Sequence, residues 1–415
     1  MRELAFKLYL FYLCSFFLHF TARLPALGSV RFDFLIVLCI IGFLVLGASD
    51  KKFSTPVDYG GTGKYLKYII VFIVLSLPFV EWPGSVLSAG IINFIKAIIF
   101  YYFTVLLVDT ENKLKKVIYV FMACQVIRVL EPMFLNITQG YWGSSTYLNT
   151  GEFASRLSGA PSDIINPNEL GYVVVTVIIW LYYLFLGGGR KLWKIVALVL
   201  ILCNIYALIL TASRSAFLAL LIAAFIMFWM SERKALFSVV AIIAVIGALM
   251  SMGDFHRDRY LSLFSSDTKG AETAQGRLDS LIVDFEVALN RPFVGHGLGT
   301  SAEANYNIRG KGQISHNLYL EVAAELGFIG LWMYLLFLKS IIQNLKILLS
   351  GLAEKKNDFL YAVTRATFVW SVVTMFFSFA QYGLSIYAIY FIAGLTLVIS
   401  SVTNPTSQFE NDRCK

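Results

Sequence analysis

The chain has 415 residues, of which 58% are hydrophobic and only 14% are charged, and its formal net charge is +8. A soluble protein of this length carries about 25% charged residues, so the composition excludes an ordinary soluble enzyme. Long apolar runs recur along nearly the whole chain, and they predict an all-α polytopic membrane protein.

The apolar runs predict about 12 transmembrane helices. No small-residue cleavage site follows the first run, so we expect it to be a retained span. The five cysteines have no disulfide or metal-site spacing, and we interpret them as small core residues. The predicted spans are residues 4–20, 33–49, 66–80, 86–108, 117–131, 170–187, 192–210, 213–230, 235–252, 316–338, 359–379 and 384–402.

Twelve spans would place both termini on the same side of the membrane. That side then carries short lysine-rich loops, which face the cytoplasm in membrane proteins. The opposite side carries two long loops, residues 132–169 and 253–315. We therefore expect three parts, namely nine helices in residues 1–252, a large outer loop in 253–315, and three helices with a cytoplasmic tail in 316–415.

The predicted outer loops use arginine where the inner loops use lysine. They contain only two lysines, Lys269 and Lys311, against Arg23, Arg31, Arg156, Arg214, Arg257, Arg259, Arg277, Arg291 and Arg309. A mild compositional bias would explain this. Because arginine binds phosphate bidentately, the alternative is an outward-facing site for a phosphate or pyrophosphate.

The second outer loop contains a segment with helical periodicity. Apolar residues at positions 278, 281, 282, 285 and 289 predict an amphipathic helix at the membrane surface, with Asp284-Phe285-Glu286 as a polar face. The following run, Gly295-His296-Gly297-Leu298-Gly299, predicts a mobile turn. Without a preceding strand, its glycines are weak evidence for nucleotide binding.

Four polar elements fall on the predicted outer side. Each has an ordinary structural explanation: a solvated or snorkelling arginine, a helix N-cap, or an interfacial histidine. Their shared side favours one common site. The elements are Arg156-Leu157-Ser158-Gly159 followed by Asn166-Pro167-Asn168, then Thr211-Ala212-Ser213-Arg214-Ser215, then Gly276-Arg277, and finally Ser315-His316-Asn317 with Glu321 and Glu325.

These motifs together resemble the bacterial O-antigen ligase family, whose C-terminal region is shared with O-antigen polymerases and O-oligosaccharyltransferases. The most specific match is the run His316-Asn317-Leu318-Tyr319-Leu320-Glu321-Val322-Ala323-Ala324-Glu325-Leu326-Gly327-Phe328-Ile329-Gly330. The resemblance covers roughly residues 150–335. It does not separate a ligase from a polymerase.

The resemblance implies a GT-C-type glycosyltransferase of the bacterial inner membrane, with both termini cytoplasmic and a periplasmic active site. The donor would be a glycan on undecaprenyl pyrophosphate, and the acceptor of a ligase would be the lipid A-core oligosaccharide. We expect contacts with membrane lipids, no nucleic acid, and a monomer or weak oligomer.

The family's motif positions correspond to Arg214, Arg277 and His316, which we take as catalytic candidates. Arg156 corresponds more loosely, and Arg31 lies in a run, Val30-Arg31-Phe32-Asp33, that resembles the start of the second span. We take as candidate substrate-binding residues Arg156, Asn168, Arg31, Glu321 and His296.

The chemistry expected of these residues is glycosyl transfer with a pyrophosphate leaving group. His316 would act as general base on the acceptor hydroxyl, and the helix N-terminus beside it would favour the neutral imidazole. Arg214 and Arg277 would hold the pyrophosphate bidentately, with Arg156 as a third contact. We expect no cofactor and no metal, because no Asp-x-Asp pair occurs and only His256 and Asp258 suggest ligands. A single in-line displacement would invert the anomeric carbon.

Two other functions remain open from the residues. A polymerase would use the same donor and a second lipid-linked glycan as acceptor. A transporter or flippase of an anionic lipid-linked glycan would suit twelve spans and Lys96 within the fourth span, although no internal symmetry is visible. Arg128, near the outer end of its span, is expected to snorkel.

Overall fold

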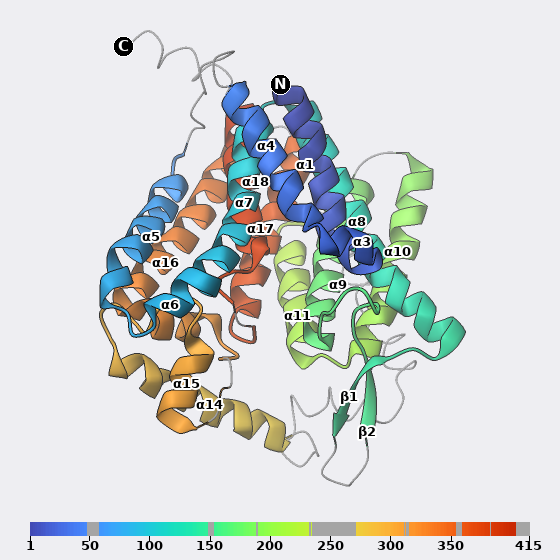
Figure 1. Cartoon of the computed structure of the whole chain (residues 1–415). Coiled ribbons are helices and arrows are strands. Elements are labelled where there is room, and N and C mark those ends of the chain that lie inside the picture. Colours follow the sequence, from blue (N-terminus) through green and yellow to red (C-terminus); the bar gives the residue numbers. More distant parts are fainter. Residues whose placement is uncertain are drawn as a thin grey trace. The chain divides into compact units, whose positions relative to one another are not determined.

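The structure is a computed structural model. It describes residues 1–47, 58–147, 153–187, 190–231, 234, 271–310, 312, 315–353, 359–381 and 383–403, without the side chains of residues 147 and 271–279. The predicted span 235–252 lies outside the described residues, as do His256 and Asp258. Figure 1 shows that the described chain is helical apart from one β-hairpin.

The chain forms two compact units. The first unit comprises residues 1–54, 107–271 and 356–370, and the second comprises residues 55–106, 272–355 and 371–415. Each unit is described by itself.

The first unit is built around α9, which is apolar on all sides. Every residue from Leu170 to Leu181 is buried, as expected for a helix without a polar face. Its elements are α1 (Arg2–Phe17), α2 (Phe20–Arg23), α3 (Pro25–Ser29), α4 (Phe32–Leu46), α8 (Glu111–Gln139), β1 (Gly143–Tyr147), β2 (Phe153–Leu157), α9 (Pro167–Leu181), the π-helix η3 (Tyr182–Leu186), α10 (Lys191–Thr211), α11 (Arg214–Trp229) and the first part of α17 (Phe359–Phe377).

Three large aromatic side chains form the centre of this unit. Trp180 of α9 packs edge-on against Trp370 of α17, with ring centroids 5.9 Å apart, and Phe121 of α8 contacts both rings. Helices α8, α10 and α11 all pack on α9. The antiparallel strands β1 and β2 pair Ser144 with Arg156.

The second unit is built on the long helix α16. Its elements are α5 (Thr62–Ser76), the 3-10 helix η1 (Leu77–Phe79), α6 (Pro83–Ser85), the π-helix η2 (Val86–Gly90), α7 (Ile91–Leu107), α14 (Ala271–Asn290), α15 (Ser301–Arg309), α16 (Leu318–Gly351), the end of α17 and α18 (Tyr387–Thr403). Helix α5 packs along α16. Asn344 of α16 donates to Asp58 and to Thr62, each at 2.9 Å, and these buried polar contacts join the two helices.

A break at Gly327 divides α16 into two segments. Gly327 has φ +69° and ψ 180°, a backbone conformation that favours glycine. The carbonyls freed at the break are paired with a neighbouring loop: His296 N donates to Ala324 O at 2.8 Å, and Gly297 N donates to Glu325 O at 2.9 Å. The first part of the run after His316 therefore forms a short helix of its own, Leu318–Leu326, before the long segment begins.

Each predicted span other than 235–252 overlaps a helix. Within the described residues, seven helical segments are long and apolar enough to cross a membrane. Three shorter apolar helices are Phe32–Leu46, Arg214–Trp229 and Tyr387–Thr403. The helical architecture is thus confirmed, and the seven candidate segments are consistent with a polytopic membrane protein. Twelve spans, a GT-C-type fold and a periplasmic loop stay predictions.

Candidate functional site

The residues singled out in the sequence divide between the two units. Arg31, Arg156, Asn168 and Arg214 lie in the first unit, whereas Arg277, His296, His316 and Glu321 lie in the second.

In the first unit, Arg156 joins the first two of the four predicted polar elements. Its side chain is only 7% exposed. Its Nε donates to the Thr211 carbonyl at 2.9 Å, and one Nη donates to Asn168 Oδ1 at 3.1 Å. Ser213 Oγ donates to the same Asn168 oxygen at 2.9 Å. Strand β2, the start of α9 and the α10–α11 turn therefore meet at this guanidinium.

The α10–α11 turn, whose carbonyls accept hydrogen bonds from Arg156, leads directly into Arg214. Ala212 has φ +47°, an uncommon conformation for a residue with a side chain. Ser213 caps α11 by accepting from Ala216 N at 3.3 Å, and Arg214 is the first residue of that helix and half-buried. A cation at the last carbonyls of α10 also complements the helix dipole. Arg156 therefore fixes the backbone of the turn that precedes Arg214.

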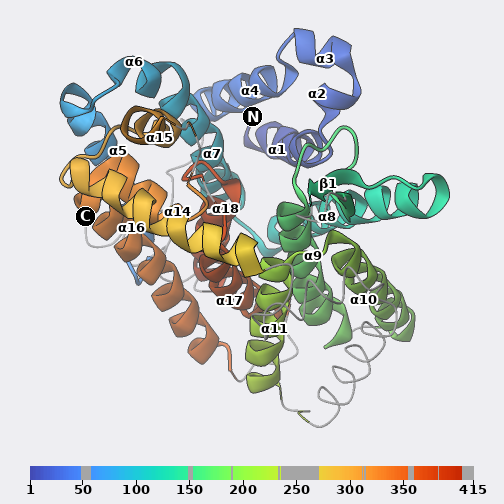
Figure 2. The same cartoon turned by 90° about the horizontal axis from the view of Figure 1, so that it is seen from below.

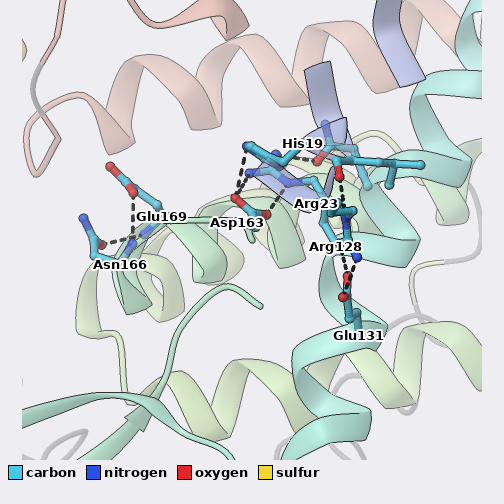
Figure 3. Close-up of polar contacts among 9 residues, drawn as sticks. His19, Arg23, Arg128, Glu131, Asp163, Asn166 and Glu169 are labelled. Atoms are coloured by element: carbon cyan, nitrogen blue, oxygen red, sulfur yellow. Dashed lines mark hydrogen bonds and ion pairs between the residues drawn. The ribbon is translucent and has the colours of Figure 1, made fainter. Parts of the chain in front are cut away.

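The start of α9 is a complete capping box, seen at one end of Figure 3. Asn166 Oδ1 accepts from the amides of Asn168 and Glu169, at 2.9 and 3.0 Å, and a Glu169 carboxylate oxygen accepts from Asn166 N at 3.0 Å. The box satisfies amides that the helix itself leaves unpaired. The N-cap predicted for Asn166-Pro167-Asn168 is confirmed.

A buried ion pair ties down the loop between β2 and α9. Arg128 Nε and Nη2 donate to the two carboxylate oxygens of Asp163 at 2.7 and 3.0 Å, and Figure 3 also shows His19 directed at Asp163. Arg23 pairs similarly with Glu131. Arg128 is buried, so the snorkelling expected for it is wrong. The sequence did contain a signal for this pairing, because an arginine within a predicted span usually needs a charged or polar partner.

Arg31 lies on a different part of the first unit. It is the exposed N-cap residue of α4, with φ +50°. Helix α4 packs against α1, whereas Arg156, Asn168 and Arg214 are carried by β2, α9 and α11.

In the second unit, His316 is exposed between two buried neighbours. Ser315 Oγ donates to Asp284 Oδ2 at 2.7 Å. The Asn317 side chain caps α16 by accepting from Tyr319 N and Leu320 N, at 3.0 and 3.2 Å. The imidazole is thus carried on a short segment that is anchored on both sides.

Asp284 is the residue that sequence reasoning missed. It belongs to the predicted helix, confirmed as α14, but it is 4% exposed rather than part of a polar outer face. Burial raises the pKa of its carboxyl, while hydrogen bonds from Ser315 and Asn305 and the charges of Arg309 and His316 act in the opposite direction.

The buried face of α14 explains the error. Val287 and Ala288 pack with Asp284 toward the protein, while the expected apolar stripe, Ile282, Phe285 and Leu289, faces outward. An outward apolar stripe suits a membrane surface.

Arg277 lies on α14, two turns before Asp284. A separation of seven residues corresponds to roughly 10 Å along the helix axis and to nearly the same face. Its side chain lies outside the described part.

Glu321 and Glu325 are both buried on the short segment before the Gly327 break. Glu321 accepts a hydrogen bond from the backbone amide of Gly383, and Glu325 accepts one from Ser301 N at 3.3 Å. Both carboxyl groups therefore hold neighbouring backbone against the helix that follows His316.

His296 is buried as well. Its Nδ1 lies 2.6 Å from Glu81 Oε2, its Nε2 lies 3.0 Å from the Val287 carbonyl, and its ring stacks on Trp82. The glycine turn around it is packed rather than free, because a side chain on Gly295 would clash with the backbone at Glu325. This packing does not support the prediction that residues 295–299 form a mobile turn.

A family model described as O-antigen ligase matches residues 197–335. This region includes Arg214, Arg277 and His316, as well as Asp284 and the Gly327 break. Arg31, Arg156 and Asn168 lie before it.

Two curated relatives are similar over longer stretches. An "O-antigen polymerase" of Salmonella muenchen is 25% identical over 290 residues, which are 68% of this chain and 66% of the relative. A "ComP-specific O-oligosaccharyltransferase" of Acinetobacter baylyi is 24% identical over 247 residues, which are 55% of this chain and 43% of the relative. The matches thus span less than two thirds of either relative. The family match and these two relatives support a relationship of this chain to the O-antigen ligase superfamily.

Proposed function

We propose that this protein is an O-antigen ligase of the bacterial inner membrane. It transfers a glycan from undecaprenyl pyrophosphate to a sugar hydroxyl of the lipid A-core oligosaccharide at the periplasmic face. The family match and the membrane helices support this proposal.

The observation that carries the proposal is the presentation of His316. An exposed imidazole between anchored neighbours, inside the family-matched region, suits a base that meets its substrate from outside. His316 takes the proton of the acceptor hydroxyl while the oxygen attacks the anomeric carbon. The carbon–oxygen bond to the pyrophosphate breaks in the same step, so the configuration inverts.

Asp284 assists this step without contacting the reacting atoms. Its buried carboxylate holds Ser315 in place, and its negative charge favours the imidazolium that forms as the proton arrives. It acts through its neighbours and is therefore a positioning residue.

The leaving pyrophosphate needs positive charge. Arg214, at the turn that Arg156 contacts, and Arg277, which lies on α14 seven residues before Asp284, are the proposed contacts. Guanidinium groups make a metal unnecessary in this scheme. Transfer by the purified enzyme in excess EDTA tests that point, because a requirement for added Mg²⁺ contradicts it.

A polymerase is the second candidate, because one of the matched relatives is named an O-antigen polymerase. The same donor and the same base would serve. Only the acceptor differs, being a second lipid-linked glycan.

Complementation in two strains separates these functions. Cells that lack their ligase, and cells that lack their polymerase, receive the wild-type gene, the His316→Ala variant or the Glu286→Gln variant as a control on the exposed face of α14. We expect a lipopolysaccharide ladder on lipid A in the ligase-deficient strain with the wild type and with Glu286→Gln, but not with His316→Ala.

A ladder only in the polymerase-deficient strain assigns the second function. A ladder with His316→Ala at wild-type density removes His316 as the base. Membrane expression of each variant is checked by immunoblot.

A further inference from the structure

A pocket in the second unit lies on the other side of α15 from Asp284. Its volume is about 370 Å³, and it is lined by Trp82, Ala302, Glu303, Tyr306 and Asn307. Figure 2 shows α15 lying beside α6, which follows Trp82 directly.

The walls of the pocket are tied together by polar contacts. Ser85 Oγ donates to a Glu303 carboxylate oxygen at 2.8 Å, and Asn307 Nδ2 donates to Glu81 Oε1 at 3.3 Å. Glu81 also meets the His296 ring, and its backbone N donates to the His296 carbonyl at 3.1 Å. The buried His296 therefore fixes the segment that carries Trp82.

The lining combines two aromatic rings with an amide and a carboxylate. Tyr306 is 66% exposed and Trp82 is half-buried. Large aromatic surfaces left open to solvent mark binding sites when polar groups accompany them. A sugar ring offers the matching chemistry, because it has an apolar C–H face for the rings and a rim of hydroxyls for the amide and the carboxylate.

The negative charge of the pocket favours neutral sugars over anionic ones. Glu303 lines it and Glu81 lies just behind it, so a phosphate or uronic acid would meet repulsion. The volume is near the lower end for ligand pockets and accommodates about one or two sugar rings.

Helix α15 lies between this pocket and the segment that carries His316. Asn305 is buried and hydrogen-bonds Asp284, whereas Tyr306 and Asn307 line the pocket. We infer that the pocket is a neutral-sugar subsite, which holds one or two rings of a glycan whose reacting end lies at His316. The identity of that glycan rests on the proposed function, but sugar binding itself does not.

The test measures binding without transfer. The full chain is purified in nanodiscs, and the probe is the neutral tetrasaccharide tetragalactose, the uncharged counterpart of tetragalacturonate. Tetragalacturonate serves as the anionic reference. Saturation-transfer NMR gives the affinity of each probe.

We expect the neutral oligosaccharide to bind, and its affinity to fall at least tenfold in Trp82→Ala and in Tyr306→Ala. Trp332→Ala, an exposed tryptophan of α16 outside the pocket, is the matched control and should bind like the wild type. Because Trp82 packs on His296, Trp82→Ala could also disturb the fold. Tyr306 is exposed, so Tyr306→Ala keeps the fold intact.

The subsite is overturned if the wild type binds no neutral oligosaccharide, if Tyr306→Ala binds it as tightly, or if tetragalacturonate binds equally well. Failure of the proposed function is a separate result. In that case oligosaccharide binding would be lost in Tyr306→Ala, while neither complemented strain would make a ladder.

Discussion

The position of His316 is set by the two buried residues on either side of it. Ser315 and Asn317 are buried and bonded, one to Asp284 and the other to the first amides of α16. A base must be held within hydrogen-bonding reach of its target, and anchoring both neighbours limits the positions that the imidazole can adopt. The contribution of Asp284 is therefore testable apart from that of His316.

Replacing Asp284 with Asn should lower kcat/KM about tenfold, or about 1.4 kcal/mol in the barrier. The amide still accepts from Ser315, but the negative charge that favours the imidazolium is gone. His316 then loses its proton more readily, so the acidic limb of the pH profile of kcat/KM should move to lower pH. Below the raised pKa of Asp284 the wild-type carboxyl is itself neutral, and the two profiles should converge there.

Glu286→Gln, on the exposed side of the same helix, should leave the profile unchanged. A lower rate in Asp284→Asn with no displacement of the acidic limb would show that Asp284 serves only the fold.

Arg156 is the corresponding anchor in the first unit. Lysine at this position keeps the charge but replaces the planar guanidinium, which reaches Thr211 and Asn168 from two different nitrogens, with a single ammonium nitrogen. Hydrogen bonds from charged groups contribute roughly 1.5–3 kcal/mol each, so Arg156→Lys should lower the free energy of unfolding by about 2 kcal/mol. Thermal unfolding in detergent measures it, with the exposed Arg190→Lys as control. An unchanged Tm would mean that the guanidinium does not hold the turn.

Among the elements, the broken helix α16 does most to shape the site. Its first segment carries Glu321 and Glu325, and its break gives carbonyls to the loop around His296. An unbroken helix would leave the amides of His296 and Gly297 without those partners, and buried amides are costly to leave unpaired. The break thus joins the His316 segment to the wall of the aromatic pocket.

Gly327→Ala should destabilise the second unit. The new methyl group would clash with the Phe293 carbonyl and sit at φ +69°, which costs of the order of 1–3 kcal/mol before any clash. We expect a lower Tm in detergent and little transfer. Gly351→Ala is the matched control, since it has open space and ends the same helix. Equal Tm values for the two variants would contradict the need for glycine at the break.

At the scale of the whole molecule, the membrane topology sets which residues meet the periplasm. Lysine-rich loops are expected inside and the arginine-bearing segments outside. Hydropathy places the spans, but their direction rests on charge alone.

Cysteine labelling tests the direction. In a cysteine-free background, Ile164→Cys should react with a membrane-impermeant maleimide in intact spheroplasts, because residue 164 is 94% exposed in the loop before α9. Asn112→Cys, exposed at the start of α8, should react only after permeabilisation. The reverse pattern would invert the topology and place the His316 site in the cytoplasm.

Local patterns were sufficient for much of this protein. Runs of apolar residues located the helices, Asn166 marked the start of α9, and the motif around His316 indicated the family. The end of α16 was predicted too early, at residue 338, because Lys339, Gln343 and Asn344 interrupt the apolar run. The structure continues the helix to Gly351, since Asn344 is bonded to α5.

Only the tertiary structure decided which polar residues are paired. Arg128 and Asp163 are 35 residues apart, Ser315 and Asp284 are 31 apart, and Arg156 meets Thr211 across 55 residues. A helical pattern shows which residues share a face but not what covers that face. In a membrane protein lipid accepts apolar side chains as readily as the interior does, so the stripe of Ile282, Phe285 and Leu289 did not mark the inside of α14. The sequence alone therefore determined the helices and the family motifs, whereas packing decided that Asp284 lies behind His316.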